Sequence, residues 1–270
     1  MTSSGLPSDL RARLSAILET EGLEADRILL FNPRKPQVTV KARSWSGVNC
    51  LLKLTSEDSD ALGQERAFYR MEEASGPHVP EVYSIGPNYV VLRYYRGRTL
   101  RECLANASPA QAKALCTTLM RTLHDLYELD SLYVDSDARC MIQTRYARLL
   151  CSGQEGSRRS RVTDGFFRIV AGFSEPLVGR LLPDTTGTMQ VIHGDLHPNN
   201  VLVCADGRMK IIDWENWTRG SALVDLLYLL PVLDKKISLR RSFPDEPLLT
   251  SLPSAAYAVM RWAASSNSRF

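Results

Sequence analysis

A short polar segment followed by a hairpin constrains this chain more than any other feature. Residues 193–200 read His-Gly-Asp-Leu-His-Pro-Asn-Asn, and two β-rich runs follow at 201–204 and 208–212, on either side of Asp206-Gly207. Asp-Gly between apolar runs predicts a hairpin, because Gly adopts positive φ without steric cost. We place the turn centre between these two residues, so positions 200 and 213 are expected to face each other at the open end.

The residues at that open end have the chemistry of a metal site. Asn200 offers a neutral oxygen and Asp213 a carboxylate, a suitable pair for a hard cation such as Mg²⁺. Asp195 lies five residues before Asn200, in the loop that enters the hairpin. Kinases use this order: a catalytic-loop Asp accepts the hydroxyl proton, an Asn binds metal, and an Asp after a hairpin binds the metal that bridges the phosphates.

Both halves of this pattern occur together in a known family. H-G-D-L-H-P-N-N followed by I-I-D-W-E at 211–215 resembles the aminoglycoside phosphotransferase / choline kinase family, small-molecule kinases with a protein-kinase-like fold. A polar turn and an unrelated strand-end cap at Asp213 would explain either half, but not the register that links them.

The resemblance implies an α+β fold of two lobes. Residues 1–96 would form the N-lobe, an antiparallel sheet plus a helix that bind the nucleotide. Residues 97–270 would form a mainly helical C-lobe with the catalytic loop, the metal-binding hairpin and the acceptor site. The resemblance also implies ATP and Mg²⁺ as cofactors.

The N-terminal part should contain a helix over Ser8–Thr20 and strands over Arg27–Phe31, Gln37–Arg43 and Val48–Thr55. The connection at 32–36 reads Asn-Pro-Arg-Lys-Pro and has no glycine. In kinases this connection is usually Gly-rich, so that backbone N–H groups approach the phosphates. Either its two basic side chains supply charge to the phosphates instead, or it is a solvated basic turn.

Lys53 lies among leucines in the third of these strands, and an unpaired ammonium is costly to bury. Kinases pair such a Lys with the nucleotide phosphates and with a helix Glu. A helix expected over roughly 59–74 offers Glu65, which Leu62, Phe68 and Tyr69 place on the inward face. We therefore predict a Lys53–Glu65 pair. The alternative is a Lys53 that points outward from an edge strand.

Two further strands are expected at Pro80–Gly86 and Tyr89–Tyr95, and the pattern breaks near residue 97, where we place the lobe boundary. In the resembled family this last strand leads into the hinge that binds adenine. The resemblance implies that the adenine slot is lined by Val91, Leu92, Arg93, Tyr94 and Tyr95.

The second lobe should open with a helix, since Ser108, Pro109 and Gln111 form a capping box with Pro at the first helical position. Helices are also expected at Thr144–Cys151 and Val162–Leu182. His193 is expected to brace the catalytic loop. Asp225 looks like the family's Asp that holds this loop through backbone hydrogen bonds.

The acceptor is less constrained. Residues 144–182 hold seven Arg against three carboxylates, and residues 234–270 hold six Lys and Arg against three. A polycationic aminoglycoside would favour carboxylates in its pocket, so a small neutral or anionic hydroxyl acceptor suits these segments better. The acceptor would be of aminoglycoside, amino alcohol or sugar type. Two alternatives stay open: a kinase of a lipopolysaccharide-core or other glycan sugar, and a catalytically silent nucleotide-binding scaffold.

Composition excludes several other classes. A net charge of +3 in 270 residues gives no electrostatic case for nucleic acid. The longest apolar run, 226–233, contains Pro231 and is far shorter than the ~20 residues of a membrane span. The six cysteines have no metal-binding spacing and predict free thiols in a reducing cytoplasm. The sequence distinguishes neither ATP from GTP nor a monomer from an oligomer.

Overall fold

The structure, a computed structural model, describes residues 5–33, 36–56, 59, 61–127, 190–220, 225–226, 229, 233 and 238–243. The chain forms two compact units: Met1–Ala105 with Asn199–Trp217, and Asn106–Pro198 with Thr218–Phe270. The helices predicted at 144–151 and 162–182, and the basic pair at 34–35, lie outside the described residues. The predicted lobe boundary near residue 97 stays a prediction.

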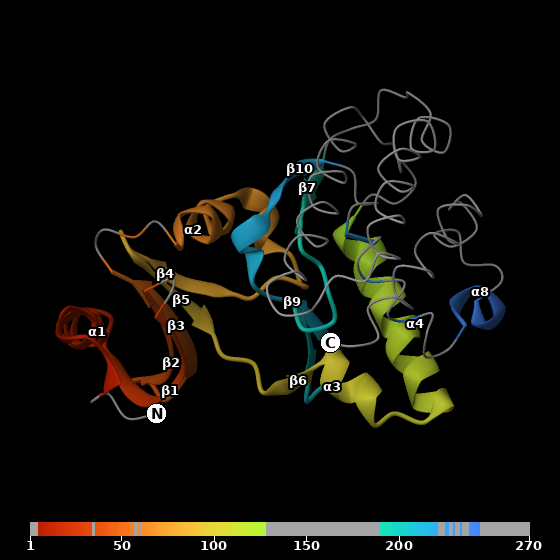
Figure 1. The fold of residues 1–270 in the computed structure, drawn as a ribbon, viewed down its shortest axis with the longest axis horizontal. Helices are drawn as coiled ribbons and strands as arrows, with labels where there is room; N and C mark the ends of the chain where they lie inside the picture. The colour runs from red at the N-terminus through yellow and green to blue at the C-terminus, as the bar shows by residue number, and fades with distance from the viewer. Residues whose placement is uncertain are drawn as a thin grey trace, which may run out of the picture. The chain divides into compact units, whose positions relative to one another are not determined.

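The first unit is built on a five-stranded antiparallel sheet (Figure 1). Its strands are β1 (Leu23–Asn32), β2 (Gln37–Ser44), β3 (Asn49–Thr55), β4 (Val82–Ile85) and β5 (Tyr89–Arg93), in the order β1-β2-β3-β5-β4. The N-terminal antiparallel sheet predicted from sequence is therefore confirmed. β3 lies between β2 and β5, so it is an interior strand.

One face of this sheet carries the apolar core. Alternate side chains of β2 and β3, such as Val40 and Leu52, are fully buried there. The helix α1 (Ser8–Thr20) packs Leu10 and Leu14 against them. Its bounds are those predicted from its apolar periodicity. Because side chains alternate along a strand, Lys53 lies on the opposite face from Leu52.

The helix α2 (Gly63–Tyr69) carries Glu65 and is shorter than the predicted helix over 59–74. Arg70 closes the last turn, Met71 is extended at φ −86° and ψ 154°, and a 3₁₀ helix, η2 (Glu72–Ser75), follows. The break has a packing reason. Tyr69 and Ala74 are both buried. On one continuous helix, two residues five positions apart would lie on different faces.

A smaller three-stranded sheet completes the first unit, with β6 (Gly97–Thr99), β8 (Val201–Cys204) and β9 (Met209–Ile211) in the order β6-β8-β9. The short helix α3 (Leu100–Ala105) follows β6. β6 can approach β8 closely because residue 97 is glycine: a Cβ there would lie 2.3 Å from the carbonyl oxygen of Val203.

The β8–β9 hairpin exists, but its predicted register is wrong by one residue. Val201 pairs with Ile211, which leaves a three-residue loop at 205–207 whose last residue, Gly207, has φ +81°. Hairpin loops of three residues use a left-handed residue at this place. As a result Asn200 lies opposite Ile212, whose N–H donates to the Asn200 carbonyl at 2.9 Å, and not opposite Asp213.

The second unit contains α4 (Pro109–Leu126), with the predicted capping box at Ser108 and Gln111. Two short strands, β7 (Gln190–Ile192) and β10 (Thr218–Gly220), pair antiparallel. A short helix, α8 (Leu239–Ser242), lies near the C-terminal end. Across the part of the chain that the structure describes, the helices are too short or too polar to cross a membrane.

Candidate active site

Lys53 and Glu65 form a buried ion pair in the first unit. The Lys53 Nζ donates to both carboxylate oxygens of Glu65, at 2.7 and 2.9 Å. Lys53 is 8% exposed and Glu65 is fully buried. The contact predicted from sequence is thus present, and the interior position of β3 rules out an outward-pointing Lys53 on an edge strand. Its role toward a nucleotide stays a prediction.

The same ammonium also reaches Asp213. Lys53 Nζ donates to Asp213 Oδ1 at 3.0 Å, so it lies between two carboxylates from distant parts of the chain. Burial disfavours the charged amine, but Glu65 and Asp213 outweigh this and raise the pKa of Lys53 above its ordinary value. Lys53 is therefore held as a cation at every physiological pH. The Asp213 side chain is 44% exposed and remains accessible to a ligand.

Asp213 has an unusual backbone conformation. Its φ of 69° and ψ of 56° lie in the left-handed region, which costs a non-glycine residue about 1–2 kcal/mol. Such strain persists where the surrounding structure enforces it. Here the turn lets the chain pass from β9 directly into η4 (Trp214–Asn216) while the carboxylate faces Lys53.

Two tryptophans after Asp213 fasten this segment to α2, as Figure 1 shows for η4 beside that helix. Trp214 is buried and stacks on Phe68, with ring centroids 4.0 Å apart and planes 6° apart. Trp217 Nε1 donates to the Gln64 carbonyl at 2.6 Å. This contact fixes Asp213 and Glu65 relative to each other. Sequence reasoning missed it; the signal was a Trp-Glu-Asn-Trp run after the metal-type Asp.

Asn200 lies at the start of the β8–β9 hairpin and is 7% exposed. The N–H of Ile212, the residue before Asp213, donates to the Asn200 carbonyl, so the two predicted metal ligands lie one position out of direct register. An amide oxygen and a carboxylate are hard donors, so the residues present fit Mg²⁺. Among the described residues no three His, Cys, Asp or Glu side chains form a metal cluster. The metal-binding role of Asn200 and Asp213 stays a prediction.

In the second unit a single carboxylate organises the predicted catalytic loop. Asp225 is fully buried and accepts the backbone N–H groups of His193 at 2.7 Å and of Gly194 at 2.8 Å. Gly194 has φ +76°, a conformation that brings two successive amides onto one carboxylate. These are the backbone contacts expected for Asp225. Tyr127, which sequence reasoning did not single out, donates its hydroxyl to Asp225 Oδ2 at 2.5 Å.

His193 braces the loop from the other side. Its ring is fully buried, and its Nδ1 accepts the backbone N–H of Asp195 at 3.2 Å. The Asp195 carboxylate is left 39% exposed, 3.9 Å from Nε2 of His197. The loop therefore holds the Asp195 backbone in place while its carboxylate is partly exposed.

The residues predicted to line an adenine slot divide between environments. Val91 packs in the apolar layer with α1, whereas Leu92 lies on the face that carries Lys53. Arg93 is exposed, and Tyr94 and Tyr95 are half-buried. By the alternation of β5, Val91 would meet a nucleotide through its backbone only. The adenine contacts stay a prediction.

Comparison with known families decides the identity of the fold. Residues 38–262 match the model of the phosphotransferase enzyme family, APH. The chain belongs to this family. The predicted resemblance is confirmed, and so is the predicted enzyme class, a phosphotransferase.

Solved structures agree with this membership in the phosphotransferase family. The choline kinase LicA from Streptococcus pneumoniae has a TM-score of 0.60 at 16% identity, covering 96% of this chain and 93% of that one. The streptomycin–ATP ternary complex of APH(2'')-IIa has a TM-score of 0.56 at 16% identity, covering 98% and 93%. The macrolide 2'-phosphotransferase MphH from Brachybacterium faecium has a TM-score of 0.51 at 19% identity, covering 95% and 83%.

These likenesses confirm the predicted two-lobed, protein-kinase-like α+β fold. At such identities they show the fold of this phosphotransferase alone. Its substrate has to be inferred from its own residues. A search of curated protein sequences finds no match.

Proposed function

We propose that this phosphotransferase moves the γ-phosphoryl group of ATP to a hydroxyl of a small molecule. The observation that carries the proposal is Lys53, held as a cation between Glu65 and Asp213. Kinases use a Lys–Glu pair of this type to hold the nucleotide phosphates. Fold relatives are described as complexes with ATP and ADP, which supports ATP as the donor.

The residues of the first unit would bind the donor. Lys53 neutralises the α- and β-phosphates, and Glu65 keeps its ammonium in place. Asn200 and Asp213 would hold Mg²⁺, which neutralises phosphate charge as transfer proceeds. Lys53 keeps both of its hydrogen bonds to Glu65 whatever Asp213 binds, so the Asp213 carboxylate would serve as a metal ligand without leaving the Lys53–Glu65 pair unsatisfied.

Asp195 would act on the acceptor. It orients the hydroxyl and accepts its proton as the oxygen attacks the γ-phosphorus. His193 and Asp225 fix the backbone of the loop and touch no reacting atom. Phosphoryl transfer depends chiefly on positioning and charge neutralisation. The buried Lys53–Glu65 pair in the first unit and the buried Asp225 cluster in the second would hold the reacting groups in position.

The acceptor is proposed to be neutral or anionic, from the excess of Arg and Lys at 144–182 and 234–270. Fold relatives are named for aminoglycosides, a macrolide and choline, so the family fold accommodates varied hydroxyls. A glycan sugar remains the alternative acceptor. The presence of Asp195, Asn200 and Asp213 argues against a silent scaffold, because a protein that only binds nucleotide needs no residue to accept the proton of an attacking hydroxyl. Free thiols at Cys50, Cys103, Cys116 and Cys204 support a cytoplasmic location.

The test combines nucleotide binding with turnover. Thermal shift with ATP and with GTP, each with and without Mg²⁺, reports donor binding by mass action. A coupled ADP assay then screens sugars, sugar phosphates, amino alcohols and aminoglycosides. Lys53→Met, Asp195→Asn and Asp213→Asn should each lower turnover by roughly 100-fold or more. Lys113→Met, on the exposed face of α4, is the control for loss of a lysine.

The outcomes separate the hypotheses. Turnover of a small hydroxyl compound, lost in the Asp195 and Asp213 variants, supports the proposal. Turnover confined to glycan fragments favours the alternative acceptor. Nucleotide binding with no Mg²⁺-dependent turnover of any acceptor, including slow ATP hydrolysis, would favour the scaffold.

A further inference from the structure

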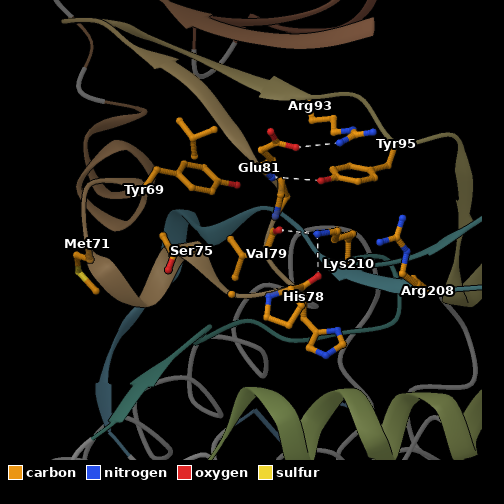
Figure 2. Close-up of a pocket in the computed structure, with 15 residues that line it drawn as sticks. Tyr69, Met71, Ser75, His78, Val79, Glu81, Arg93, Tyr95, Arg208 and Lys210 are labelled. Carbon is orange, nitrogen blue, oxygen red and sulfur yellow. Dashed lines mark hydrogen bonds and ion pairs between the residues drawn. The ribbon is translucent and has the colours of Figure 1, made fainter. Parts of the chain in front are cut away.

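The first unit contains a cavity that the proposed chemistry does not use. It has a volume of about 550 Å³ and is bordered by the end of α2, the segment 74–82, β5 and the start of β9 (Figure 2). None of Lys53, Glu65 or Asp213 lines it. Its volume lies within the range of small-molecule sites, ~300–1,000 Å³.

The centre of this cavity wall is a buried ammonium. Lys210 is 7% exposed, and its Nζ donates to the carbonyls of Pro77 at 2.7 Å and Val79 at 2.9 Å. The same nitrogen lies 4.8 Å from the centre of the Tyr95 ring. Figure 2 shows it beneath that ring, with both carbonyl bonds drawn. Within the described part of the chain no carboxylate pairs with Lys210.

This arrangement leaves a charge uncompensated. A buried cation is costly without a counter-ion. Two carbonyls and an aromatic face offset part of that cost, but they carry no net negative charge. An ammonium has three N–H donors, and the carbonyls use two of them. An anionic group at the third would complete the site.

The other charged residues of the cavity also favour an anionic ligand. Arg93 and Arg208 line it, and its one lining carboxylate, Glu81, is already paired with Arg93 at 3.0 Å. Arg208 binds Asp206, which lies outside the cavity, and remains largely exposed. Met71 and Val79 add apolar surface. Figure 2 shows Arg208 and Lys210 on the same side.

We propose that this cavity binds a small organic anion, with its phosphate or carboxylate group at Lys210 and Arg208 and its apolar part against Met71 and Val79. The proposal needs neither ATP nor turnover, and so it stands or falls separately from the kinase assignment.

The experiment is isothermal titration of the intact protein with phenyl phosphate and with benzoate, which separate a phosphate from a carboxylate preference. The variants are Arg208→Glu and Lys210→Met. The matched control is Arg98→Glu, an exposed arginine on β6 of the same three-stranded sheet that does not line the cavity. Lys53→Met tests whether the probes bind at the proposed nucleotide-phosphate site and not in the cavity.

We expect at least one probe to bind the wild type. Its Kd should rise about tenfold or more in Arg208→Glu and Lys210→Met, the factor expected when one charge-assisted hydrogen bond is lost. It should stay within about twofold in Arg98→Glu, which changes no residue of the cavity. If circular dichroism shows that Lys210→Met does not fold, the exposed Arg208→Glu carries the test.

Three results would overturn the proposal. The first is no binding of either probe at about 10 mM, where a ligand of ~1 mM affinity is nearly saturating. The second is unchanged affinity in Arg208→Glu. The third is a loss of binding in Lys53→Met with none in the cavity variants, which would place the probe at the nucleotide phosphates.

Discussion

Replacing Glu65 by Gln tests the electrostatic core of the site. The shape of the side chain is kept, but Lys53 loses one of its two charge-assisted bonds to residue 65, and an amide NH₂ is placed against an ammonium. A charge-assisted hydrogen bond contributes about 1.5–3 kcal/mol, and breaking a buried pair costs about 3–5 kcal/mol. Since Asp213 still contacts Lys53 at 3.0 Å, we expect a loss near the lower end, about 3 kcal/mol.

The assay is thermal unfolding, measured by scanning calorimetry. A loss of that size should lower Tm by roughly 6–12 °C for a chain of this length. The control is Glu81→Gln, which removes the same charge from the half-exposed pair with Arg93 at 3.0 Å and should cost under about 1 kcal/mol. Adding Lys53→Met to Glu65→Gln should lower stability by less than the sum of the two single substitutions, because each single substitution already removes the Lys53–Glu65 interaction.

The reasoning fails on either of two results. If Glu65→Gln and Glu81→Gln lower Tm equally, burial is not what makes the Glu65 pair matter. If the loss of stability in the double variant equals the sum of the losses in Glu65→Gln and Lys53→Met, the two side chains are not coupled.

Three further predictions rest on single contacts. Gly97→Ala should destabilise the protein by about 2 kcal/mol or more in urea unfolding, because its Cβ would lie 2.3 Å from the Val203 carbonyl oxygen and neither backbone can yield; stability equal to wild type would contradict this. Tyr127→Phe should cost about 1–3 kcal/mol by removing the hydroxyl bound to Asp225, and should lower turnover without changing the thermal shift by ATP; a reduced ATP shift with intact turnover would count against the loop-bracing role. Burial raises the pKa of the Cys116 thiol from 9.0 to about 12, so between these pH values the folded state keeps a proton that the unfolded state loses. Stability should therefore fall as pH rises from 9 toward 12. A Cys116→Ala variant should show a flatter decline, and a pH slope identical to that of the wild type would refute the prediction.

The features predicted correctly from sequence depend on neighbours along the chain. The helix Ser8–Thr20 follows from apolar periodicity, and the capping box at Ser108 joins residues three apart. The backbone contacts of Asp225 came from a motif resemblance. The Lys53–Glu65 pair was predicted because a lysine among leucines needs a nearby carboxylate, and the inward face of the next helix offered one.

Two local predictions were wrong for reasons of packing and turn geometry. The helix predicted to reach residue 74 stops at Tyr69, because burying both Tyr69 and Ala74 requires a break. The hairpin register shifted by one because Gly207 closes a three-residue loop. A one-residue shift changes which residue faces Asn200, and sequence pattern alone does not separate loops of two and three residues.

By itself the sequence determined the family of this protein: Asp195, Asn200 and Asp213 follow a strand lysine in an order that indicated a phosphotransferase, and the APH family model confirms it. The catalytic and metal-binding roles of these residues stay predictions. Only the tertiary structure decided how these groups are held. Lys53 reaches Asp213 across 160 residues of chain, and the stacking of Trp214 on Phe68 fixes that segment to α2. Such contacts depend on the packing of whole elements, whereas the motif depends on residue identity and spacing, which any reader of the chain can see.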